Sequence, residues 1–289
     1  MKDCPAEKTE KIKPGLPFRA RIPARLPFLL LSAYEDLRTG MTKRKDRRPS
    51  SCCSVSIVIP TLNEEHYIVQ CLRAFRDNIH VLETIVVDAG SGDRTCLLAK
   101  EAGARVIVHD QSVENGGGRG GQIKAGVNAA AGDVVMIVHA DTILPGNEID
   151  RVLAALNKHP GVIGGAVGCR FDSPRLRFRF VELANDMRAA FFKIGFGDQV
   201  QFFRRQPVVS GNLFPGIALM EDVEFSIRLH RLGRRIYLFG GALVSTRRWD
   251  KIGSRNAFWI LRQVAVYLVC RLWSQPDTVK LYRKYYNRA

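Results

Sequence analysis

The sequence predicts an α/β fold with a mostly parallel sheet flanked by helices and an apolar helix near the C-terminus. In the first half of the chain, short β-branched segments alternate with helical segments, which is typical of consecutive β-α-β units. The 289 residues, of which 46% are hydrophobic and 25% charged, have ordinary globular composition. A chain of this length holds one large domain with shorter extensions.

The first predicted strand is Val55–Ile59, a β-branched run that is expected to end at Pro60. Asn63 is expected to cap the helix that follows. Glu64 and Glu65 would then lie in its first turn, where carboxylates complement the helix dipole. Helical spacing of apolar residues continues through Ile68, Leu72 and Phe75.

Three further strands are predicted at residues 83–88, 105–109 and 133–140. The segments between them are expected to be helical, over residues 93–103 and 120–131. All four predicted strands of this half would then be parallel, joined by crossover helices.

The second half of the chain is less regular. Residues 162–171 are expected to form a strand, and residues 219–232 a helix that ends before a glycine. Residues 174–195 are rich in arginine and phenylalanine, and are either a packed helix with a solvated face or part of an acceptor site. Residues 236–239 and 242–244 are expected to form a hairpin or an edge pair.

Three regions differ in composition. Residues 1–53 are basic and are expected to be a disordered extension, unless translation starts at Met41. Residues 54–250 are expected to form the main domain. Residues 251–289 form a basic and apolar helical segment, in which 257–270 is too short to cross a bilayer and suits either a buried or an interfacial helix.

Charge and cysteine content narrow the class of protein further. The chain carries 44 Lys and Arg against 28 Asp and Glu, a net charge of +16, which indicates an anionic partner. Without a nucleic-acid-binding motif, a membrane surface or a phosphorylated substrate is favoured over nucleic acid. The seven cysteines form no CxxC pair, which favours free thiols in a reducing cytosol over disulfides or zinc.

Two of the predicted strands lead into an aspartate, Asp88 and Asp141. Because the carboxyl ends of parallel strands meet at one edge of a sheet, both carboxylates are expected to face one crevice. Ligands bind at this edge in open α/β sheets, so the two acids are the first candidates for a functional site.

The glycine run at 116–121 satisfies the GxGxxG pattern of dinucleotide-binding proteins and precedes a predicted helix. Residues 111–115 separate it from its strand, whereas the dinucleotide motif follows its strand directly. An NAD(P)-dependent oxidoreductase is therefore kept as the less favoured hypothesis.

Five short motifs follow one another along the chain, at residues 58–64, 87–95, 139–141, 220–222 and 247–249. In this order they resemble the motifs of inverting glycosyltransferases of family 2, over about residues 54 to 250. The resemblance implies the GT-A fold of nucleotide-diphospho-sugar transferases. It also implies an enzyme that moves a sugar from a nucleotide-diphospho-sugar to an acceptor hydroxyl or carboxyl.

Residues 118–122, 139–142 and 197–199 further resemble a bacterial subgroup of this family. More distantly, the chain is similar to dolichyl-phosphate mannosyltransferases and diaponeurosporenoate glucosyltransferases. The net charge of +16 and the apolar segment 257–270 favour a cytoplasmic enzyme that lies peripherally on the inner face of the cell membrane. A lipid-linked or apolar acceptor would then arrive from the bilayer.

The resemblance also implies roles for individual residues. Asp88 and Glu64 would bind the nucleoside, with Asp93 nearby. Asp141 matches the last acid of the family's DxD motif and would hold Mg²⁺ or Mn²⁺. The first acid of that motif is replaced by His139, which would either ligate the metal or contact a phosphate.

Asp222 matches the family's catalytic base, with Glu221 beside it. The set expected to bind the nucleotide sugar is Pro60, Thr61, Glu64, Asp88, Asp93, Arg119, Gln122, His139, Ala140, Asp141, Arg247, Arg248 and Trp249. The set expected at the acceptor is Gly197, Asp198 and Gln199. The replacement at His139 keeps a second hypothesis open, a nucleotide-sugar-binding module without turnover.

Overall fold

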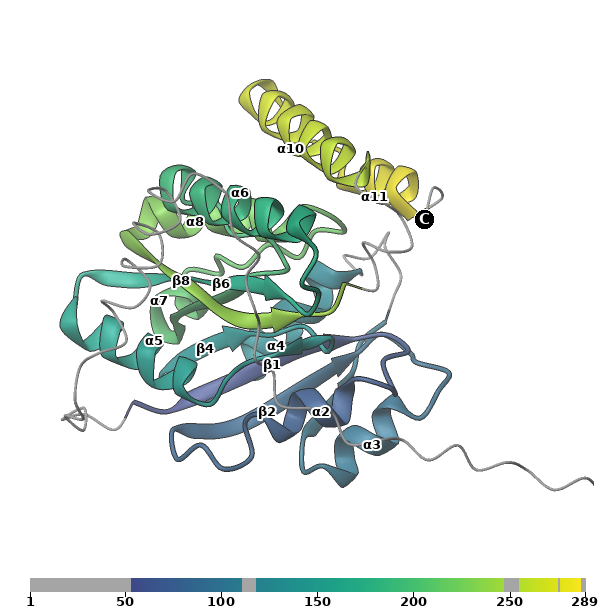
Figure 1. Cartoon of the computed structure of the whole chain (residues 1–289), viewed down its shortest axis with the longest axis vertical. Helices are drawn as coiled ribbons and strands as arrows, with labels where there is room; N and C mark the ends of the chain where they lie inside the picture. Colours follow the sequence, from purple (N-terminus) through teal and green to yellow (C-terminus); the bar gives the residue numbers. More distant parts are fainter. Residues whose placement is uncertain (1–52, 111–117, 247–254, 275, 287–289) are drawn as a thin grey trace, which may run out of the picture. The chain divides into compact units, whose positions relative to one another are not determined.

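The computed structural model describes residues 53–110, 118–246, 255–274 and 276–286. The chain divides into two compact units, 1–43 and 44–289, and every described residue belongs to the second. An eight-stranded sheet in the order β3-β2-β1-β4-β7-β6-β8-β5 runs through this unit, with helices against it (Figure 1). The predicted α/β fold is confirmed.

The strands are β1 (Val55–Thr61), β2 (Val81–Asp88), β3 (Arg105–Val108), β4 (Val134–Ile137), β5 (Thr142–Ile143), β6 (Val162–Phe171), β7 (Val200–Arg204) and β8 (Arg234–Val244). The helices are α2 (Ile68–Arg73), α3 (Thr95–Glu101), α4 (Arg119–Ala129), α5 (Asn147–Lys158), α6 (Leu176–Phe192), α7 (Arg205–Ser210), α8 (Glu221–Leu232), α10 (Arg255–Trp273) and α11 (Thr278–Tyr286).

Strands β3, β2, β1 and β4 are parallel neighbours, as the alternating pattern predicts. Strand β7 then pairs antiparallel with both β4 and β6, and β6 pairs parallel with β8. The parallel half brings the carboxyl ends of β1, β2 and β4 to one edge, and the antiparallel β7 begins at that same edge.

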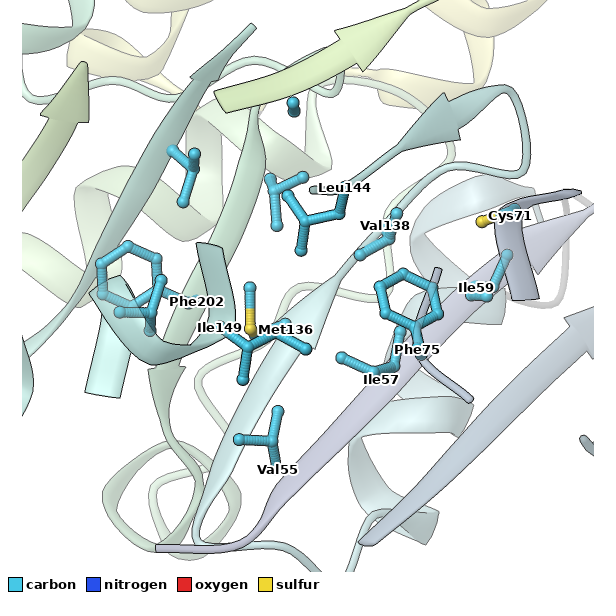
Figure 2. Close-up of a cluster of buried hydrophobic side chains, with 14 of the residues drawn as sticks. Val55, Ile57, Ile59, Cys71, Phe75, Met136, Val138, Leu144, Ile149 and Phe202 are labelled. Carbon is cyan, nitrogen blue, oxygen red and sulfur yellow. The ribbon is translucent and has the colours of Figure 1, made fainter. Parts of the chain in front are cut away.

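Hydrophobic side chains fill both faces of the sheet. One cluster includes Val55, Ile57 and Met136 beside residues of α2 and α5, and Figure 2 shows Phe75 and Ile149 packed into it. The cluster on the opposite face contains Val58 of β1, whose side chain points away from those of Ile57 and Ile59, together with side chains from α4 and α8. This double burial explains why the strands are continuous apolar runs rather than alternating ones.

Two boundary predictions near β1 are wrong. The strand does not stop at Pro60 but continues to Thr61, because β4 pairs with β1 only as far as Val58 and Pro60 lies beyond that ladder. Asn63 does not cap a helix: it takes a left-handed conformation with φ of 55°, and α2 begins only at Ile68, with no acid in its first turn.

Two predictions further along the chain are also wrong. Strand β4 ends at Ile137, so Asp141 lies in the turn before β5 and not at a strand tip. The expected hairpin is a single strand, β8, in which Gly240 and Gly241 have φ of 65° and 125°. These glycines form a bulge, and β6 pairs with β8 on both sides of it.

The C-terminal helices pack on α8 through a cluster that includes Met220, Val223, Val264 and Tyr267. Helix α10 is therefore partly buried. For residues 257–270 the sequence allowed either a buried helix or an interfacial one, and this packing agrees with the first. None of the helices in the described part of the chain is long and apolar enough to cross a membrane. The boundaries expected at residues 53 and 250 remain predictions.

Candidate functional site

Asp88 ends strand β2 and organises the loop that follows it. Its Oδ1 accepts hydrogen bonds from the amides of Gly90 (2.9 Å) and Ser91 (2.7 Å), and its Oδ2 accepts one from the Thr61 hydroxyl (3.0 Å). Burial alone would raise the pKa of Asp88, but the hydrogen bonds outweigh it and the pKa lies below its ordinary value. The carboxylate is ionised and shapes the loop at the sheet edge.

Gln122 of α4 joins the ends of the two central strands. Its buried Nε2 donates to the carbonyls of Thr61 and Val87, each at 2.9 Å. Thr61 follows Pro60 as the last residue of β1 and is only 2% exposed. The predicted binding residues Thr61 and Gln122 thus fix the edge on which a ligand would lie.

The loop after β1 is tied to the loop after β2. Asn63 accepts a hydrogen bond from the Gly92 amide at 3.0 Å, and the Glu64 amide donates to Thr95 at 2.8 Å. Asp93 accepts from the amides of Thr95 (2.9 Å) and Glu65 (3.2 Å), so it joins α3 to the first loop. Glu64 and Asp93 therefore lie together, as expected, beside the loop of Asp88.

His139 and Asp141 lie in one tight turn between β4 and β5. The amide of Thr142 donates to the carbonyl of His139 at 3.0 Å, and the Cys71 thiol donates to the same carbonyl at 3.6 Å. Burial, with a smaller contribution from the Asp141 carboxylate, raises the pKa of Cys71. Ala140, between the two candidate ligands, is buried and anchors the turn.

The start of α8 places two acids at the same edge. Met220 precedes the helix in a left-handed conformation with φ of 66°, an arrangement that costs about 1–3 kcal/mol in a non-glycine residue. The side chain of Glu221 is 1% exposed, whereas that of Asp222 is 15% exposed. Asp222 is therefore the more accessible of the two acids.

Arg119, the first residue of α4, holds this pair of acids. Its Nε donates to Oε1 of Glu221, and its Nη2 lies 3.9 Å from Oδ2 of Asp222. Burial raises the pKa of Glu221, and the charge of Arg119 offsets only part of that effect. Among the described residues, Oε2 of Glu221 has no hydrogen-bond partner.

Two glycines at the start of α4 allow this close packing. A Cβ on Gly120 would lie 2.2 Å from the Ile217 carbonyl and 3.0 Å from Cβ of Glu221. Gly118 has φ of 80°, and a Cβ on it would lie 3.2 Å from the Ala218 carbonyl. Close approach of the start of α4 to the segment before α8 thus accounts for Gly118 and Gly120 without a dinucleotide.

Gly197 closes the site from the loop between α6 and β7. Its amide donates to Oδ2 of Asp222 at 2.7 Å. A Cβ on Gly197 would lie 3.2 Å from Nη1 of Arg119 and 3.3 Å from Nε2 of His139. Arg119, His139 and Asp222 therefore surround one point above Gly197, although they come from three distant parts of the sequence.

Asp198 and Gln199, the two residues after Gly197, point away from the candidate site and into the protein. Asp198 accepts a hydrogen bond from Asn185 at 3.1 Å, and burial raises its pKa. Gln199 donates to the Tyr237 hydroxyl at 3.0 Å. These two predicted acceptor residues support the loop from below, while Gly197 faces the site.

Sequence reasoning missed Arg188 and Gln201. The Arg188 guanidinium lies 3.3 Å from the centre of the Phe196 ring and donates to the Ile194 carbonyl at 2.6 Å. Gln201 donates to the carbonyls of Gly195 (3.2 Å) and Asp222 (3.3 Å). Arg188 thus holds the loop against α6, and Gln201 holds it against α8. Arg188 is one arginine among several in a basic stretch, so the sequence carried no signal for it.

The residues described contain no cluster of three His, Cys, Asp or Glu side chains placed to hold a metal. His139 and Asp141 offer one nitrogen and one oxygen ligand from a single turn. A divalent cation held by one or two protein ligands takes its remaining ligands from phosphates and water. The donor set thus fits a cation that arrives with a diphosphate. Arg247, Arg248 and Trp249 lie outside the described residues.

The fold and this edge define a class, the α/β enzymes of GT-A type that bind a nucleotide at the carboxyl ends of their parallel strands. The profile of the Glycosyl transferase family 2 matches residues 56–211. The chain belongs to glycosyltransferase family 2, whose members transfer a sugar from a nucleotide sugar. This membership decides against the dinucleotide oxidoreductase.

Among curated proteins, the chain is 32% identical over 166 residues to an undecaprenyl-phosphate 4-deoxy-4-formamido-L-arabinose transferase of Pseudomonas fluorescens, covering 55% of this chain and 49% of that protein. It is 31% identical over 112 residues to an uncharacterized glycosyltransferase of Mycobacterium tuberculosis, covering 39% of this chain and 48% of that protein. The chain thus spans about half the length of these relatives.

Among solved structures, glucosyl-3-phosphoglycerate synthase of Mycobacterium tuberculosis with Mn²⁺, UDP-glucose and phosphoglyceric acid matches with a TM-score of 0.55 and 23% identity, over 81% of this chain and 87% of that one. TarS of S. aureus with UDP-GlcNAc matches with a TM-score of 0.51 and 17% identity, over 67% and 59%. These likenesses confirm the GT-A fold.

Proposed function

We propose that this chain is an inverting glycosyltransferase in which Asp222 is the base. Its donor would be a nucleoside-diphosphate sugar, and its acceptor a hydroxyl or carboxyl of a lipid-linked or apolar molecule. The observation that carries the proposal is the position of Asp222. Its carboxylate is oriented by the Gly197 amide, and it is the more exposed of the two acids at the start of α8.

Inversion requires the acceptor oxygen to attack the sugar carbon from the side opposite the leaving diphosphate. Asp222 accepts the acceptor's proton as the new carbon–oxygen bond forms and the bond to the diphosphate breaks. A carboxyl acceptor arrives already ionised and needs no base. The role of Asp222 therefore applies to hydroxyl acceptors.

The buried neighbour, Glu221, has a different part in this proposal. It accepts a hydrogen bond from Nε of Arg119 and so orients the guanidinium, whose Nη1 faces the point above Gly197. A guanidinium in that place stabilises the negative charge that develops on the leaving diphosphate. Glu221 acts through Arg119 and is a positioning residue.

Asp141 and His139 would hold the divalent cation, Mn²⁺ or Mg²⁺, which supplies positive charge to the diphosphate when bound. Support comes from their shared turn at the sheet edge, and from the solved structure of similar fold that contains Mn²⁺ with UDP-glucose. Asp88, Glu64 and Asp93 would border the nucleoside, because they shape the two adjoining loops at that edge.

A lipid-linked acceptor is supported by the similarity of the chain to a curated relative that is an undecaprenyl-phosphate 4-deoxy-4-formamido-L-arabinose transferase. The net charge of +16 suits the anionic surface at which such an acceptor lies. We therefore place the enzyme peripherally on the inner face of the cell membrane.

The proposal is tested by a screen of UDP-, GDP- and other nucleotide sugars for binding by calorimetry and for release of the nucleoside diphosphate, each with and without Mn²⁺. The expected result is metal-dependent binding of one donor and slow turnover that Asp222→Asn removes. Binding without any turnover, even with lipid extracts as acceptor, would support the binding-module alternative. Absence of binding for every donor would contradict the proposal.

A further inference from the structure

The inward face of helix α6 combines apolar and acidic side chains. The helix packs on β6 and β8 (Figure 1), and beside the buried Phe178 and Ala189 this face carries two acids, Glu182 and Asp186, that are 4% and 0% exposed. Glu182 accepts the Phe171 amide at 2.7 Å, and Asp186 pairs with Arg170 at 3.1 Å. The acids are thus satisfied inside the domain, which leaves the outward face to other residues.

The outward face of α6 is an apolar stripe. Its members recur at intervals of three or four residues, and so follow one side of the helix. Their exposed fractions lie between 39% and 74%. The stripe consists of Leu176, Phe180, Leu183, Met187 and Phe191. A continuous apolar face in water marks a site of contact with a partner or a membrane.

The exposed charged side chains beside the stripe on α6 are basic. Arg177 and Arg179 flank it on opposite sides, although Arg179 also pairs with Glu182 at 2.9 Å, and Arg175 and Lys193 are exposed at its two ends. A second copy of this helix would bring like charges together. An anionic bilayer complements both features, because acyl chains accept the apolar side chains and lipid phosphates accept the arginines.

We propose that the outward face of α6 is the surface by which this protein binds an anionic membrane. The inference rests on the proposed function for its meaning, since a lipid-linked acceptor needs a site near the bilayer. The loop that follows α6 provides the connection: five residues beyond Phe192, the Gly197 amide reaches Asp222 at 2.7 Å. The helix that lies on the lipid thus continues into the candidate active site.

The test is flotation of the full chain with vesicles of phosphatidylglycerol and phosphatidylcholine in equal parts, without donor or acceptor. The variant Phe180→Glu/Met187→Glu adds two charges to the stripe. The matched control, Ile79→Glu/Leu97→Glu, makes the same change at two exposed apolar residues away from α6, which are 92% and 51% exposed.

The wild type is expected to float at low salt, to leave the vesicles at high salt, and to ignore pure phosphatidylcholine. The α6 variant should lose binding by at least about tenfold, and the control by less than about twofold. Equal loss in both variants, or a wild type that does not float, would overturn the inference. So would a wild-type dimer that the α6 variant dissociates in sedimentation, since a second copy would then cover the stripe.

Two further measurements keep the outcomes distinct. Phe180→Ser/Met187→Ser adds no charge and is used if the glutamate variant melts earlier than the wild type; it should also lose vesicle binding. Donor binding is measured separately in solution and should be equal in all variants. Loss of donor binding throughout would oppose the proposed function and leave the vesicle result intact.

Discussion

The amide of Gly197 donates a hydrogen bond to Oδ2 of Asp222 across 2.7 Å, and so joins the loop after α6 to the first turn of α8. Asp222→Asn removes the charge but keeps the size of the side chain. Because the base is lost, transfer to a hydroxyl should fall by about 10²–10⁴-fold. Donor affinity, measured by calorimetry, should stay within about twofold, since Asp222 faces the acceptor's proton and not the nucleotide.

Asp172→Asn is the control for this change. Asp172, like Asp222, accepts a hydrogen bond from a backbone amide, that of Thr246 at 2.9 Å, but it is exposed and does not belong to α8. It should keep full transfer activity. Turnover by Asp222→Asn at the wild-type rate would remove Asp222 as the base.

Gly197→Ala should obstruct the site directly. The added methyl would lie 3.2 Å from Nη1 of Arg119 and 3.3 Å from Nε2 of His139, closer than most real contacts of this kind. Since both side chains must give way, transfer should fall by at least about tenfold, while the free energy of unfolding falls by only about 1–3 kcal/mol. Gly161→Ala is the matched control, because nothing lies within 4 Å of its added methyl. Equal activity of both variants would show that the space above Gly197 is not used.

Arg119→Ala should destabilise the protein as well as inactivate it. Glu221 would be left buried without its ion-pair partner, at a cost of about 3 kcal/mol in the free energy of unfolding. Burial already raises the pKa of Glu221 with Arg119 present, so the loss should grow as pH rises and lessen as Glu221 is protonated at acid pH.

The double variant Arg119→Ala/Glu221→Gln separates the two roles of Arg119. It should recover stability, since no buried charge is left unpaired, but not transfer activity. The control is Arg105→Ala, whose half-exposed side chain lies 3.8 Å from Glu83 and should contribute less than about 1 kcal/mol. Urea unfolding at several pH values measures both effects, and a double variant with restored turnover would contradict the role given to Arg119.

Glu224 of α8 binds Tyr267 and Arg271 of α10, and the stability that these contacts contribute should depend on pH. Although burial opposes ionisation, hydrogen bonds from Arg271, Arg228 and Tyr267 lower its pKa from 4.5 to about 2. A lowered pKa means that the stabilisation is complete above pH 4.5 and is lost as pH falls toward about 2. Glu224→Gln should therefore destabilise the protein at neutral pH, by about 1.5–3 kcal/mol for the loss of hydrogen bonds to an ionised group.

The difference in free energy of unfolding between wild type and Glu224→Gln should narrow as the solution is acidified through that range. Glu101→Gln, an exposed change on α3, should show neither the cost nor the narrowing. A constant difference at every pH would mean that the loss comes from packing and not from the ionised carboxylate.

Local patterns in the sequence were sufficient to predict the sheet's parallel half. The β-branched run Val55–Ile59 is confirmed as a strand of this half, although the strand continues to Thr61. Outside this half, the strand predicted at Val162–Phe171 is confirmed as well. Strand β7 and helix α7 were missed because Gln201 interrupts the apolar run of the former and Pro207 that of the latter. Gly240-Gly241 was misread because the same dipeptide serves hairpins and bulges.

The candidate site was predictable in its acids but not in its geometry. Asp88, Asp141 and Asp222 follow from motif order, and the structure brings their loops to one edge of the sheet. The surroundings of Gly197 could not be predicted, because Arg119 and His139 reach it from two other parts of the chain. Local spacing carries no information about such contacts.

The central claim is tested most directly at the turn of Asp141. Titration calorimetry of UDP with and without Mn²⁺ should be run on the wild type, on Asp141→Ala and on the exposed control Asp150→Ala. We expect Mn²⁺ to strengthen UDP binding by at least about tenfold in the wild type and the control, and Asp141→Ala to retain only the weaker, metal-independent binding. Metal-dependent binding of equal strength in Asp141→Ala, or no binding of UDP or any other nucleoside diphosphate to the wild type, would contradict the account.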